Sequence, residues 1–269
     1  MTADLSFDEF LKTVCPGRNL DWRKYRRASR RRVLDRIHAL GLSGFSAYAR
    51  YLEADPEEAA ALPNLLRVTV SQFFREKDTW QDLGTTVLPL LLMRISGSRP
   101  LRVLSIGCCN GEEPYSLALL WKSGLQAAFP GTGIAITALD VDEGCLRRAE
   151  KGVYARKTLR EVPRDMIMTW FAPDAQGYRL DREVRSLVDF RRMDLLNDPL
   201  PENQDLILCR YLVFTYFHGR LRRETAGKII QALSPKGFVV LGEKEEPGPE
   251  LESVLAPLSG VGCVYARRY

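Results

Sequence analysis

Two glycines and the pair of carboxylates that follows them are the residues of this sequence best suited to bind a ligand. Gly107 and Gly111 bracket a short turn in LRVLSIGCCNGEEPYS, residues 101–116, between a strand-like run and a helix. Glycines in such a turn accept backbone conformations that other residues resist, and they let a ligand approach the main chain. Glu112 and Glu113 open the helix, where its dipole favours acidic side chains. The pattern predicts a cofactor loop, with a tight turn without a ligand as the alternative.

The spacing and the charge of this loop favour a cofactor that carries no phosphate. A dinucleotide site uses the spacing GxGxxG and offers bare helix N–H groups to a pyrophosphate. Here the spacing differs, and Glu112 and Glu113 would repel an anion at the same place. S-adenosylmethionine (SAM), a sulfonium compound with an amino-acid tail, fits the loop better. In this interpretation Glu113 faces the positive end of the cofactor, and Gly107 lies against it.

Asp140 is a second candidate ligand residue, at the end of the strand-like run ITALD. A carboxylate at a strand end can accept hydrogen bonds from both ribose hydroxyl groups of a nucleoside. Asp140 follows the glycine loop by about one β-α-β unit, which is the separation that this role requires. An aspartate that only caps the strand end is the alternative.

The elements that must position these residues alternate between strand-like and helical segments. Strand-like runs occur at residues 101–106, 134–139, 206–209, 237–241 and 262–267, and helical ones at 112–122, 143–151 and 220–233. This alternation predicts an α/β fold, in which a parallel sheet carries helices on both faces. Residues 153–194 are less regular, with strand-like pieces at 177–180 and 187–191, and they predict a small β insertion.

The segment before the sheet predicts a small all-α domain. Residues recur at steps of three and four along residues 22–40, which predicts one buried helix stripe. The stripe consists of Trp22, Tyr25, Ser29, Val33, Ile37 and Leu40. Gly41 suits the end of this helix, because a glycine there tolerates positive φ. We expect the helical domain at residues 1–76 and the SAM-binding domain at 77–269, with the β insertion at about 153–194.

Basic residues are concentrated in one stretch of the chain. The 269 residues carry a net charge of +5, yet residues 17–40 alone hold nine Lys or Arg against Asp21 and Asp35. The remainder is near neutral, so the Arg-rich helix 22–40 predicts one acidic partner surface. A solvated arginine face is the alternative. Nucleic acid is disfavoured as a partner, because the remainder of the chain is not basic and no nucleic-acid-binding module is recognisable.

Composition disfavours several other classes of protein. The six cysteines include no CxxC pair and the chain has two histidines, so no metal site is expected. The N-terminus lacks the apolar core of a secretory signal. The longest apolar run, residues 87–93, ends at Arg94 and is far shorter than the roughly 20 residues of a membrane span. We expect a cytoplasmic protein without membrane insertion.

Several segments together resemble the CheR family, the chemotaxis receptor methyltransferases. In family order they are RRASRRRVLDRIHALGLSGFSAYARYLEADPEE, VSQFFRE, SIGCCNGEEPYSLA, ALDVDEGCLRRAEKGVY, MDLLNDPLP, DLILCR and LSPKGFVVLGEKE. Their combination is specific, although no single motif would be. The resemblance covers nearly the whole chain. It implies a class I SAM-dependent methyltransferase domain of Rossmann-like fold, with a small all-α N-terminal domain and a small β insertion.

The resemblance also implies a reaction and a set of site residues. CheR enzymes transfer a methyl group from SAM, which becomes S-adenosyl-L-homocysteine, to glutamate side chains of receptor signalling helices. The family's ligand contacts correspond to Ser71, Arg75, Glu113, Asp140, Asp194 and Leu195 of this sequence. The Arg-rich helix would then face an acidic helical region of the receptor.

A glutamate acceptor needs orientation more than activation. Its carboxylate is already ionised at neutral pH, with a reference pKa of about 4.3, so no general base is required. Arg75, which the resemblance places beside the cofactor, is suited to orient a carboxylate. Tyr216 could donate a hydrogen bond to the acceptor oxygen. A structural ion pair for Arg75 and an aromatic ring packed on the sheet for Tyr216 are the alternatives.

The sequence departs from the family pattern on the acceptor side. Tyr211 and Leu212 stand where the family has Asn-Val in CRNVLIYF, and the stretch to Tyr216 is one residue longer. Because the family Asn helps to hold the cofactor, Tyr211 and Leu212 are predicted cofactor contacts that change the floor of the site. Thr69 and Ser71 also replace the Asn and Thr of the family's NxTxFFRE.

These departures leave three functions open. The leading one is a protein-glutamate O-methyltransferase that acts on chemotaxis-type receptors. The second is a methyltransferase for another acceptor, either a small molecule or a different protein group. The third is a SAM-binding regulatory protein without catalysis.

Overall fold

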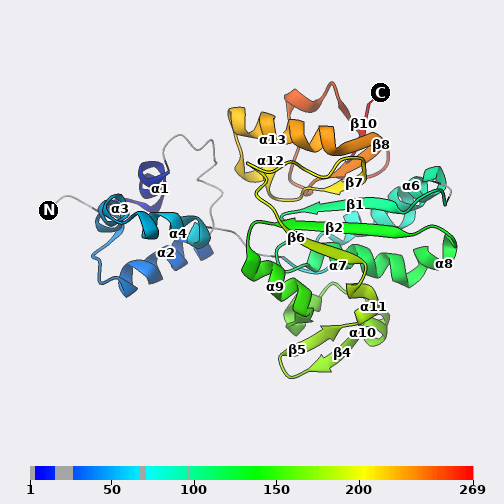
Figure 1. Cartoon of the computed structure of the whole chain (residues 1–269), viewed down its shortest axis with the longest axis horizontal. Helices are drawn as coiled ribbons and strands as arrows, with labels where there is room; N and C mark the ends of the chain where they lie inside the picture. Colours follow the sequence, from blue (N-terminus) through cyan, green and yellow to red (C-terminus); the bar gives the residue numbers. More distant parts are fainter. Residues whose placement is uncertain (1–3, 16–26, 67–70, 96, 269) are drawn as a thin grey trace. The chain divides into compact units, whose positions relative to one another are not determined.

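The computed structural model describes residues 4–15, 27–66, 71–95 and 97–268 of the chain. The chain divides into two units (Figure 1). One comprises Met1–Thr69 with Thr215–Arg222, and the other comprises Val70–Phe214 with Arg223–Tyr269. The first unit is helical, and the second contains both β-sheets.

The described residues of the N-terminal unit form a small helical core. Its helices are α1 (Phe7–Val14), α2 (Arg27–Ala39), α3 (Phe45–Ala54) and α4 (Pro56–Leu66). A capping box opens α1, because Ser6 accepts from the Glu9 N–H while Glu9 accepts from the Ser6 N–H. Phe10 and Tyr48 are fully buried at the centre and lie with their ring centroids 5.6 Å apart.

The predicted helix stripe is confirmed where the structure describes it. Ser29, Val33 and Ile37 are the buried residues of α2, and Leu40, one residue beyond its end, packs half-buried against the same core. Trp22 and Tyr25 lie outside the described residues. The buried side chains of α2 pack against the neighbouring helices, so α2 has one buried face although it is rich in arginine.

A seven-stranded sheet forms the centre of the second unit, in the order β6-β2-β1-β7-β8-β10-β9. The strands are β1 (Leu101–Ile106), β2 (Ile134–Asp140), β6 (Val188–Arg192), β7 (Gln204–Leu208), β8 (Leu233–Val240), β9 (Leu255–Pro257) and β10 (Val264–Arg267). The strands from β6 to β8 pair in parallel, whereas β10 is antiparallel to β8 and β9. Every residue of β7 is buried, as expected for a parallel strand covered on both faces.

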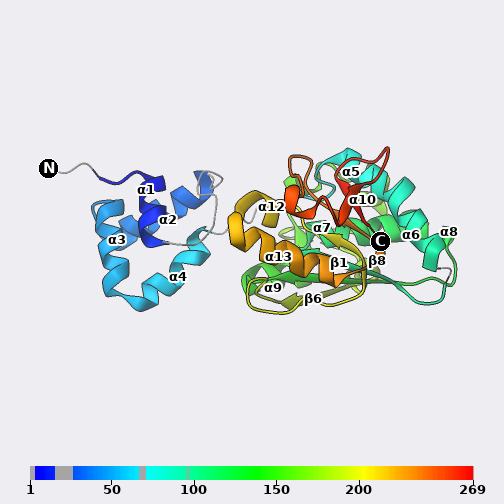
Figure 2. The ribbon, with the colours of Figure 1, turned by 90° about the horizontal axis from the view of Figure 1, so that it is seen from above.

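Helices lie on both faces of this sheet (Figures 1 and 2). The helical segments that follow the N-terminal helices, apart from those of the insertion, are α5 (Lys77–Asp82), η2 (Leu83–Val87), α6 (Leu88–Ile95), α7 (Glu112–Leu120), η3 (Trp121–Leu125), α8 (Gln126–Ala128), α9 (Glu143–Lys151), α12 (Val213–Tyr216), α13 (Gly219–Ala232) and η5 (Pro249–Leu251). The predicted α/β architecture is therefore confirmed. Within the described ranges, none of the helices combines the length and the apolar character that crossing a membrane requires.

A separate three-stranded antiparallel sheet lies between α9 and β6 in the chain. It has the order β3-β5-β4, with β3 (Val153–Tyr154), β4 (Phe171–Asp174) and β5 (Gly177–Leu180). The helical segments η4 (Arg156–Leu159), α10 (Arg164–Trp170) and α11 (Arg182–Arg185) accompany it. The boundaries of this insertion as a domain stay a proposal.

The strand-like piece at residues 187–191, expected in the insertion, belongs to the main sheet instead. It forms β6, which pairs in parallel with β2 from Val188 to Arg192. Val188 and Phe190 pack against buried residues of the larger domain. Burial of these two side chains explains why the segment joins the larger sheet.

Candidate cofactor and acceptor site

The strand order places the glycine loop at a position where open α/β sheets bind ligands. From β1 the chain moves to β2 and β6 on one side, and then returns to β7 on the other side of β1. Ligands of such sheets bind beyond the carboxyl ends of the strands, where the order reverses. The loop from Gly107 follows β1, and Arg210 follows β7. The two segments therefore meet at this switch point.

Asp140, at the end of β2, holds the glycine loop in shape. Its Oδ2 accepts from the Cys109 N–H at 2.8 Å, and its Oδ1 accepts from the Asp142 N–H at 2.9 Å. A carboxylate has about four acceptor positions. Asp140 therefore shapes the glycine loop, and its hydrogen bonds to the ribose stay a prediction.

The loop requires glycine at position 111, both because of its backbone conformation and because little room is left for a side chain. Its φ is 87°, and a Cβ there would lie 2.9 Å from Ala149 Cβ and 3.0 Å from Phe190 Cζ.

Gly111→Ala is expected to lower the melting temperature by about 5–10 °C, because strain and overpacking together cost about 2–3 kcal/mol. Gly227→Ala in α13 is the matched control, since nothing lies within 4 Å of its Cβ. Equal thermal unfolding of the two variants would contradict this reading of the loop.

Gly107 brings the loop close to the segment after β7. Its φ is 74°, and a Cβ there would lie 2.9 Å from Leu212 Cδ2. The structure therefore places two of the predicted cofactor contacts, Gly107 and Leu212, against each other.

Glu113 is a largely buried carboxylate beside this loop. Its Oε1 accepts from Ser105 Oγ at 2.8 Å, and its Oε2 accepts from Arg210 Nη1 at 3.4 Å. Burial raises the pKa of Glu113, and the positive charge of Arg210 opposes that rise. A carboxylate in such a poorly solvated place interacts strongly with a nearby cation.

Arg210 connects Glu113 to the segment before α5. Its side chain is only 3% exposed, and its Nη2 donates to the Arg75 carbonyl at 2.8 Å and to Glu76 Oε2 at 2.6 Å. Its guanidinium lies 5.7 Å from the centroid of the Trp80 ring. Arg210 Nε is buried and has no partner among the described protein groups. Arg210 thus fixes the FFRE segment relative to the loop.

Arg75 and Tyr211 contact each other beside the network of hydrogen bonds that Glu113, Arg210 and Glu76 form. The Arg75 guanidinium carbon is 4.0 Å from the centroid of the Tyr211 ring. The Tyr211 hydroxyl donates to Glu76 Oε1, and the Tyr211 N–H donates to Glu245 Oε2 at 2.7 Å. The structure therefore brings Arg75 and Tyr211 together with Glu113, whose pKa the charge of Arg75 also lowers.

Ser71 is held on the other side of the loop by Glu112. Glu112 is 2% exposed, and burial raises its pKa against the hydrogen bonds from Ser71 and Asn110. Two residues further on, the buried Phe73 ring packs edge-on against Tyr154 at 4.8 Å. The segment from Ser71 is therefore fixed both to the glycine loop and to the insertion.

Asp194 and Leu195 form a turn after β6. Asp194 Oδ1 accepts from the Leu196 N–H at 3.0 Å, so its carboxylate shapes the turn. Lys228 Nζ of α13 donates to the Leu195 carbonyl at 3.1 Å and to the Leu196 carbonyl at 2.8 Å. The structure supports these two residues as a fixed turn, and their contact with the cofactor stays a prediction.

Tyr216 ends α12 and belongs to Thr215–Arg222, the segment that groups with the N-terminal unit. Its predicted hydrogen bond to the acceptor therefore stays a prediction.

Unusual backbone conformations are concentrated at this site. Among the described residues, seven other than glycine have a positive φ, and four of them are Phe74, Glu76, Cys109 and Tyr211. Such conformations cost energy and persist where the surroundings hold them, which is typical of ligand-binding regions.

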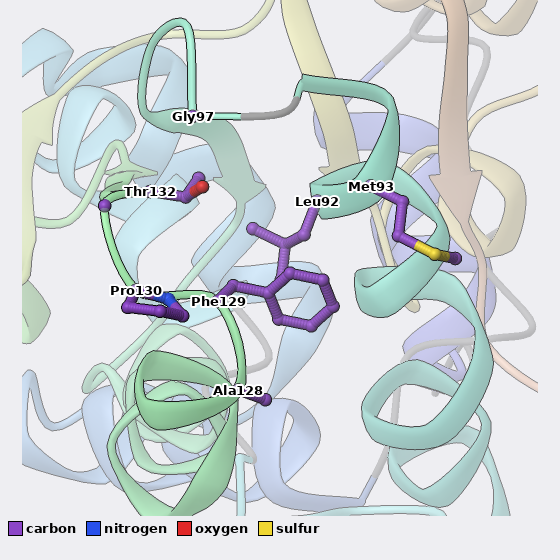
Figure 3. A pocket seen from close by; sticks show the side chains of 8 residues that line it. Leu92, Met93, Gly97, Ala128, Phe129, Pro130 and Thr132 are labelled. Atoms are coloured by element: carbon purple, nitrogen blue, oxygen red, sulfur yellow. The ribbon is translucent and has the colours of Figure 1, made fainter.

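A shallow hollow of about 580 Å³ lies elsewhere in this unit (Figure 3). Its lining residues are Leu92, Met93, Gly97, Ala128, Phe129, Pro130, Gly131 and Thr132. They belong to α6, to the end of α8 and to the turns that enter β1 and β2, at the opposite ends of the strands from the glycine loop. None of them has an ionisable side chain, so the hollow offers no groups for catalysis.

Two segments match the same protein family. Residues 6–66 match the CheR methyltransferase all-alpha domain, and residues 69–256 match the CheR methyltransferase SAM-binding domain. The chain belongs to the CheR methyltransferase family. As a CheR methyltransferase, it is an enzyme that uses SAM as its cofactor.

Relatives of this CheR methyltransferase share most of its length. A chemotaxis protein methyltransferase of Listeria monocytogenes is 30% identical, over 91% of this chain and 92% of its own. Chemotaxis protein methyltransferase 2 of Pseudomonas aeruginosa is 31% identical, over 80% and 76%. The probable biofilm formation methyltransferase WspC of Pseudomonas aeruginosa is 32% identical, over 80% of this chain and 50% of its own.

The carboxylates around the glycine loop of this CheR methyltransferase fit SAM. Glu113 near the start of α7 and Asp140 at the end of β2 both lie close enough to Cys108 for their charges to act on its thiol. Two carboxylates beside the loop suit a sulfonium and ribose hydroxyl groups and would repel a diphosphate. Gly107 adopts a positive φ and has no side chain, so the main chain of the loop is open to close approach at this point.

Four residues of the network are not among those predicted from the sequence. Glu76 and Arg210 lie inside the motifs FFRE and DLILCR, so the family resemblance of these motifs was a signal for both residues. Glu245 ends the resembling motif LSPKGFVVLGEKE and so had a similar signal, whereas Lys228 lies in the middle of α13 and had none.

Proposed function

We propose that this CheR methyltransferase transfers the SAM methyl group to glutamate side-chain carboxylates of chemotaxis-type receptors. The observation that carries the proposal is the Arg75 guanidinium, held 4.0 Å over the Tyr211 ring and close to Glu113. An arginine fixed beside the cofactor site is suited to bind a carboxylate. Relatives named chemotaxis protein methyltransferase support the choice of receptor.

In this proposal each predicted contact has a task in holding SAM. Glu113 faces the sulfonium end, and Asp140 accepts hydrogen bonds from the ribose. The remaining contacts are Ser71, Arg75, Gly107, Asp194, Leu195, Tyr211 and Leu212. Bound SAM supplies an electrophilic methyl group, and the protein positions the acceptor in line with it.

The acceptor carboxylate requires little chemical activation. Its reference pKa of about 4.3 leaves it ionised at neutral pH, so no general base is needed. Arg75 binds and orients this carboxylate, and Tyr216 donates a hydrogen bond to its oxygen. Both side chains hold the acceptor oxygen close to the methyl group, and neither takes up or releases a proton during the transfer.

The Arg-rich helix is the proposed docking surface for an acidic helical region of the receptor. Arg27, Arg30 and Arg31 of α2 are exposed. Arg36 instead pairs with buried Glu58 at 2.5 Å and holds the pKa of that carboxyl below its usual range. The exposed arginines would therefore steer association, while Arg36 fixes the helix. We place this docking domain at residues 1–76, the catalytic domain at 77–269, and the enzyme in the cytoplasm.

Methyl transfer to receptor fragments tests the proposal. Receptor cytoplasmic fragments incubated with methyl-labelled SAM and this enzyme are expected to gain label that leaves as methanol in mild alkali, as a methyl ester does. Fragments whose candidate glutamates are replaced by glutamine serve as the control. Label that resists mild alkali would reject glutamate as the acceptor.

SAM binding is expected to weaken as the pH falls through the pKa of Glu113. Burial raises this pKa above its ordinary value of 4.5, so the weakening begins above pH 4.5. A bound cation favours the ionised carboxylate, and below the pKa binding must release a proton. The Kd then rises about tenfold for each pH unit.

Glu113→Gln is the variant that checks this pH dependence. It is expected to weaken SAM binding at neutral pH by about 10- to 100-fold and to flatten the pH profile. Glu112→Gln is the matched control, because burial also raises the pKa of Glu112 and yet we place it away from the sulfonium. Calorimetric titrations that show the same slope for Glu113→Gln and the unmodified enzyme would contradict the role of Glu113.

A second candidate function is methyl transfer to another acceptor. The Tyr211 ring on the acceptor side favours it, because an aromatic ring also suits a small planar acid. Labelled product in a small-molecule extract, with none in receptor fragments, would support this candidate. Tight SAM binding without methyl transfer to receptor fragments or to small molecules would instead indicate a regulatory SAM-binding protein.

A further inference from the structure

We infer that Tyr211 is a positioning residue that holds the Arg75 guanidinium on the acceptor side and thereby favours a carboxylate acceptor. The inference rests on the proposed role of Arg75 in binding that carboxylate. It assigns a separate task to the aromatic residue next to Arg75, which acts on the acceptor through Arg75.

Two contacts of the Tyr211 side chain define this task. The Arg75 guanidinium carbon lies 4.0 Å from the ring centroid, within the range of a cation–π interaction. The Tyr211 hydroxyl donates to Glu76, which is the next residue in the chain after Arg75. One side chain therefore contacts both the guanidinium of Arg75 and the side-chain carboxylate of the next residue, Glu76.

Glu76 is itself a fixed anchor for the Tyr211 hydroxyl. Its Oε2 accepts from Arg210 Nη2 at 2.6 Å and from the Glu243 N–H at 3.2 Å. The Arg210 side chain is only 3% exposed, so this ion pair is shielded from solvent. The Glu76 carboxylate therefore has a fixed position. Because the Tyr211 hydroxyl donates to it, the Tyr211 ring next to Arg75 has a fixed orientation.

The fold makes room for an aromatic ring at a backbone position that disfavours one. The φ of Tyr211 is 56°, in the left-handed region that bulky residues rarely adopt. Glu245 Oε2 stabilises this turn by accepting from the Tyr211 N–H at 2.7 Å and from the Gly242 N–H at 2.8 Å. A Cβ on Gly242 would lie 2.6 Å from the Tyr211 ring. Strain held in place beside a reacting group motivates a functional task for the side chain.

Three substitutions separate positioning from a structural role. Tyr211→Phe keeps the ring but loses the hydrogen bond to Glu76, so it is expected to lower kcat/KM for the acceptor by about threefold, less than removal of the ring. Tyr211→Leu removes the ring and is expected to lower kcat/KM about tenfold. The Kd for SAM is expected to rise less, by about threefold, because Tyr211 is one of several proposed contacts of the cofactor. Tyr211→Asn suits a positive φ, so we expect a similar loss of transfer while the melting temperature stays the same or rises.

A double variant tests whether Tyr211 acts through Arg75. In an Arg75→Ala background, Tyr211→Leu is expected to cause no further loss of transfer. Additive losses would overturn the inference. Full transfer by Tyr211→Asn, or losses that follow the melting temperature or the Kd for SAM, would overturn it as well.

A measurement without any acceptor keeps this inference distinct from the proposed function. Crystal structures of the unmodified enzyme and of Tyr211→Leu, both with S-adenosylhomocysteine, are expected to show the Arg75 guanidinium displaced in the variant. An unchanged position of Arg75 would overturn the inference, whichever acceptor the enzyme methylates.

Discussion

Arg75→Ala is expected to lower kcat/KM for the acceptor by about 100- to 1000-fold, while the Kd for SAM changes by less than about tenfold. The expected loss is large because a misplaced acceptor carboxylate rarely reaches the geometry that transfer requires. The contacts of Arg75 favour an effect on the acceptor. Its guanidinium stacks on Tyr211, whereas Arg210, which pairs with Glu113, donates to the main-chain carbonyl of Arg75.

Arg75→Lys is the conservative control for this prediction. Lysine keeps the positive charge but lacks the planar fork that matches a carboxylate, so we expect transfer to recover only in part. Steady-state kinetics with receptor fragments and calorimetry with SAM provide the two readouts. A variant Arg75→Ala that loses SAM binding and transfer to the same extent would contradict an acceptor role and assign Arg75 to the cofactor alone.

Asp140→Ala is expected to weaken SAM binding by about 100-fold, the second large effect. The substitution removes charge-assisted hydrogen bonds to the ribose, which are worth about 1.5–3 kcal/mol each. It also releases the Cys109 and Asp142 N–H groups that Asp140 holds, so the glycine loop loses its anchor at the end of β2.

Asp142→Ala is the matched control, because it removes a carboxylate two residues away. Asp142 caps α9 by accepting from the Cys145 N–H at 3.0 Å, so its loss should affect stability more than binding. Calorimetric titration with SAM compares the two variants. Equal Kd values for Asp140→Ala and Asp142→Ala would contradict the ribose role of Asp140.

The sequence allowed the fold and the centre of the cofactor loop to be predicted because those features have local signals. Strand-like runs alternate with helical ones, and Gly107, Gly111 and Asp140 lie at the junctions between them. Such signals depend on neighbours in the chain, so each can be read without knowledge of the tertiary structure.

The strand β6 shows where local signals end. The segment at residues 187–191 was correctly predicted as a strand, but its sheet was not. Which sheet it joins depends on the packing of Val188 and Phe190 against residues from β2 and α9. That packing is a property of the folded domain, and periodicity along the strand does not contain it.

The acceptor side of the site was only partly predictable for the same reason. Tyr211 stood out because it departs from a family motif, yet its contacts come from distant parts of the chain. Its hydroxyl meets Glu76 and its amide meets Glu245. Lys228 supports the Leu195 turn from the middle of a helix and gives no sign of this in the sequence.

The identity of the methylated atom tests the proposed reaction most directly. Tandem mass spectrometry of receptor fragments after the reaction is expected to locate methyl groups on glutamate side-chain oxygens, and to find almost none with Arg75→Ala. Methyl groups on nitrogen or sulfur atoms of the fragments, or on small molecules alone, would contradict glutamate methylation.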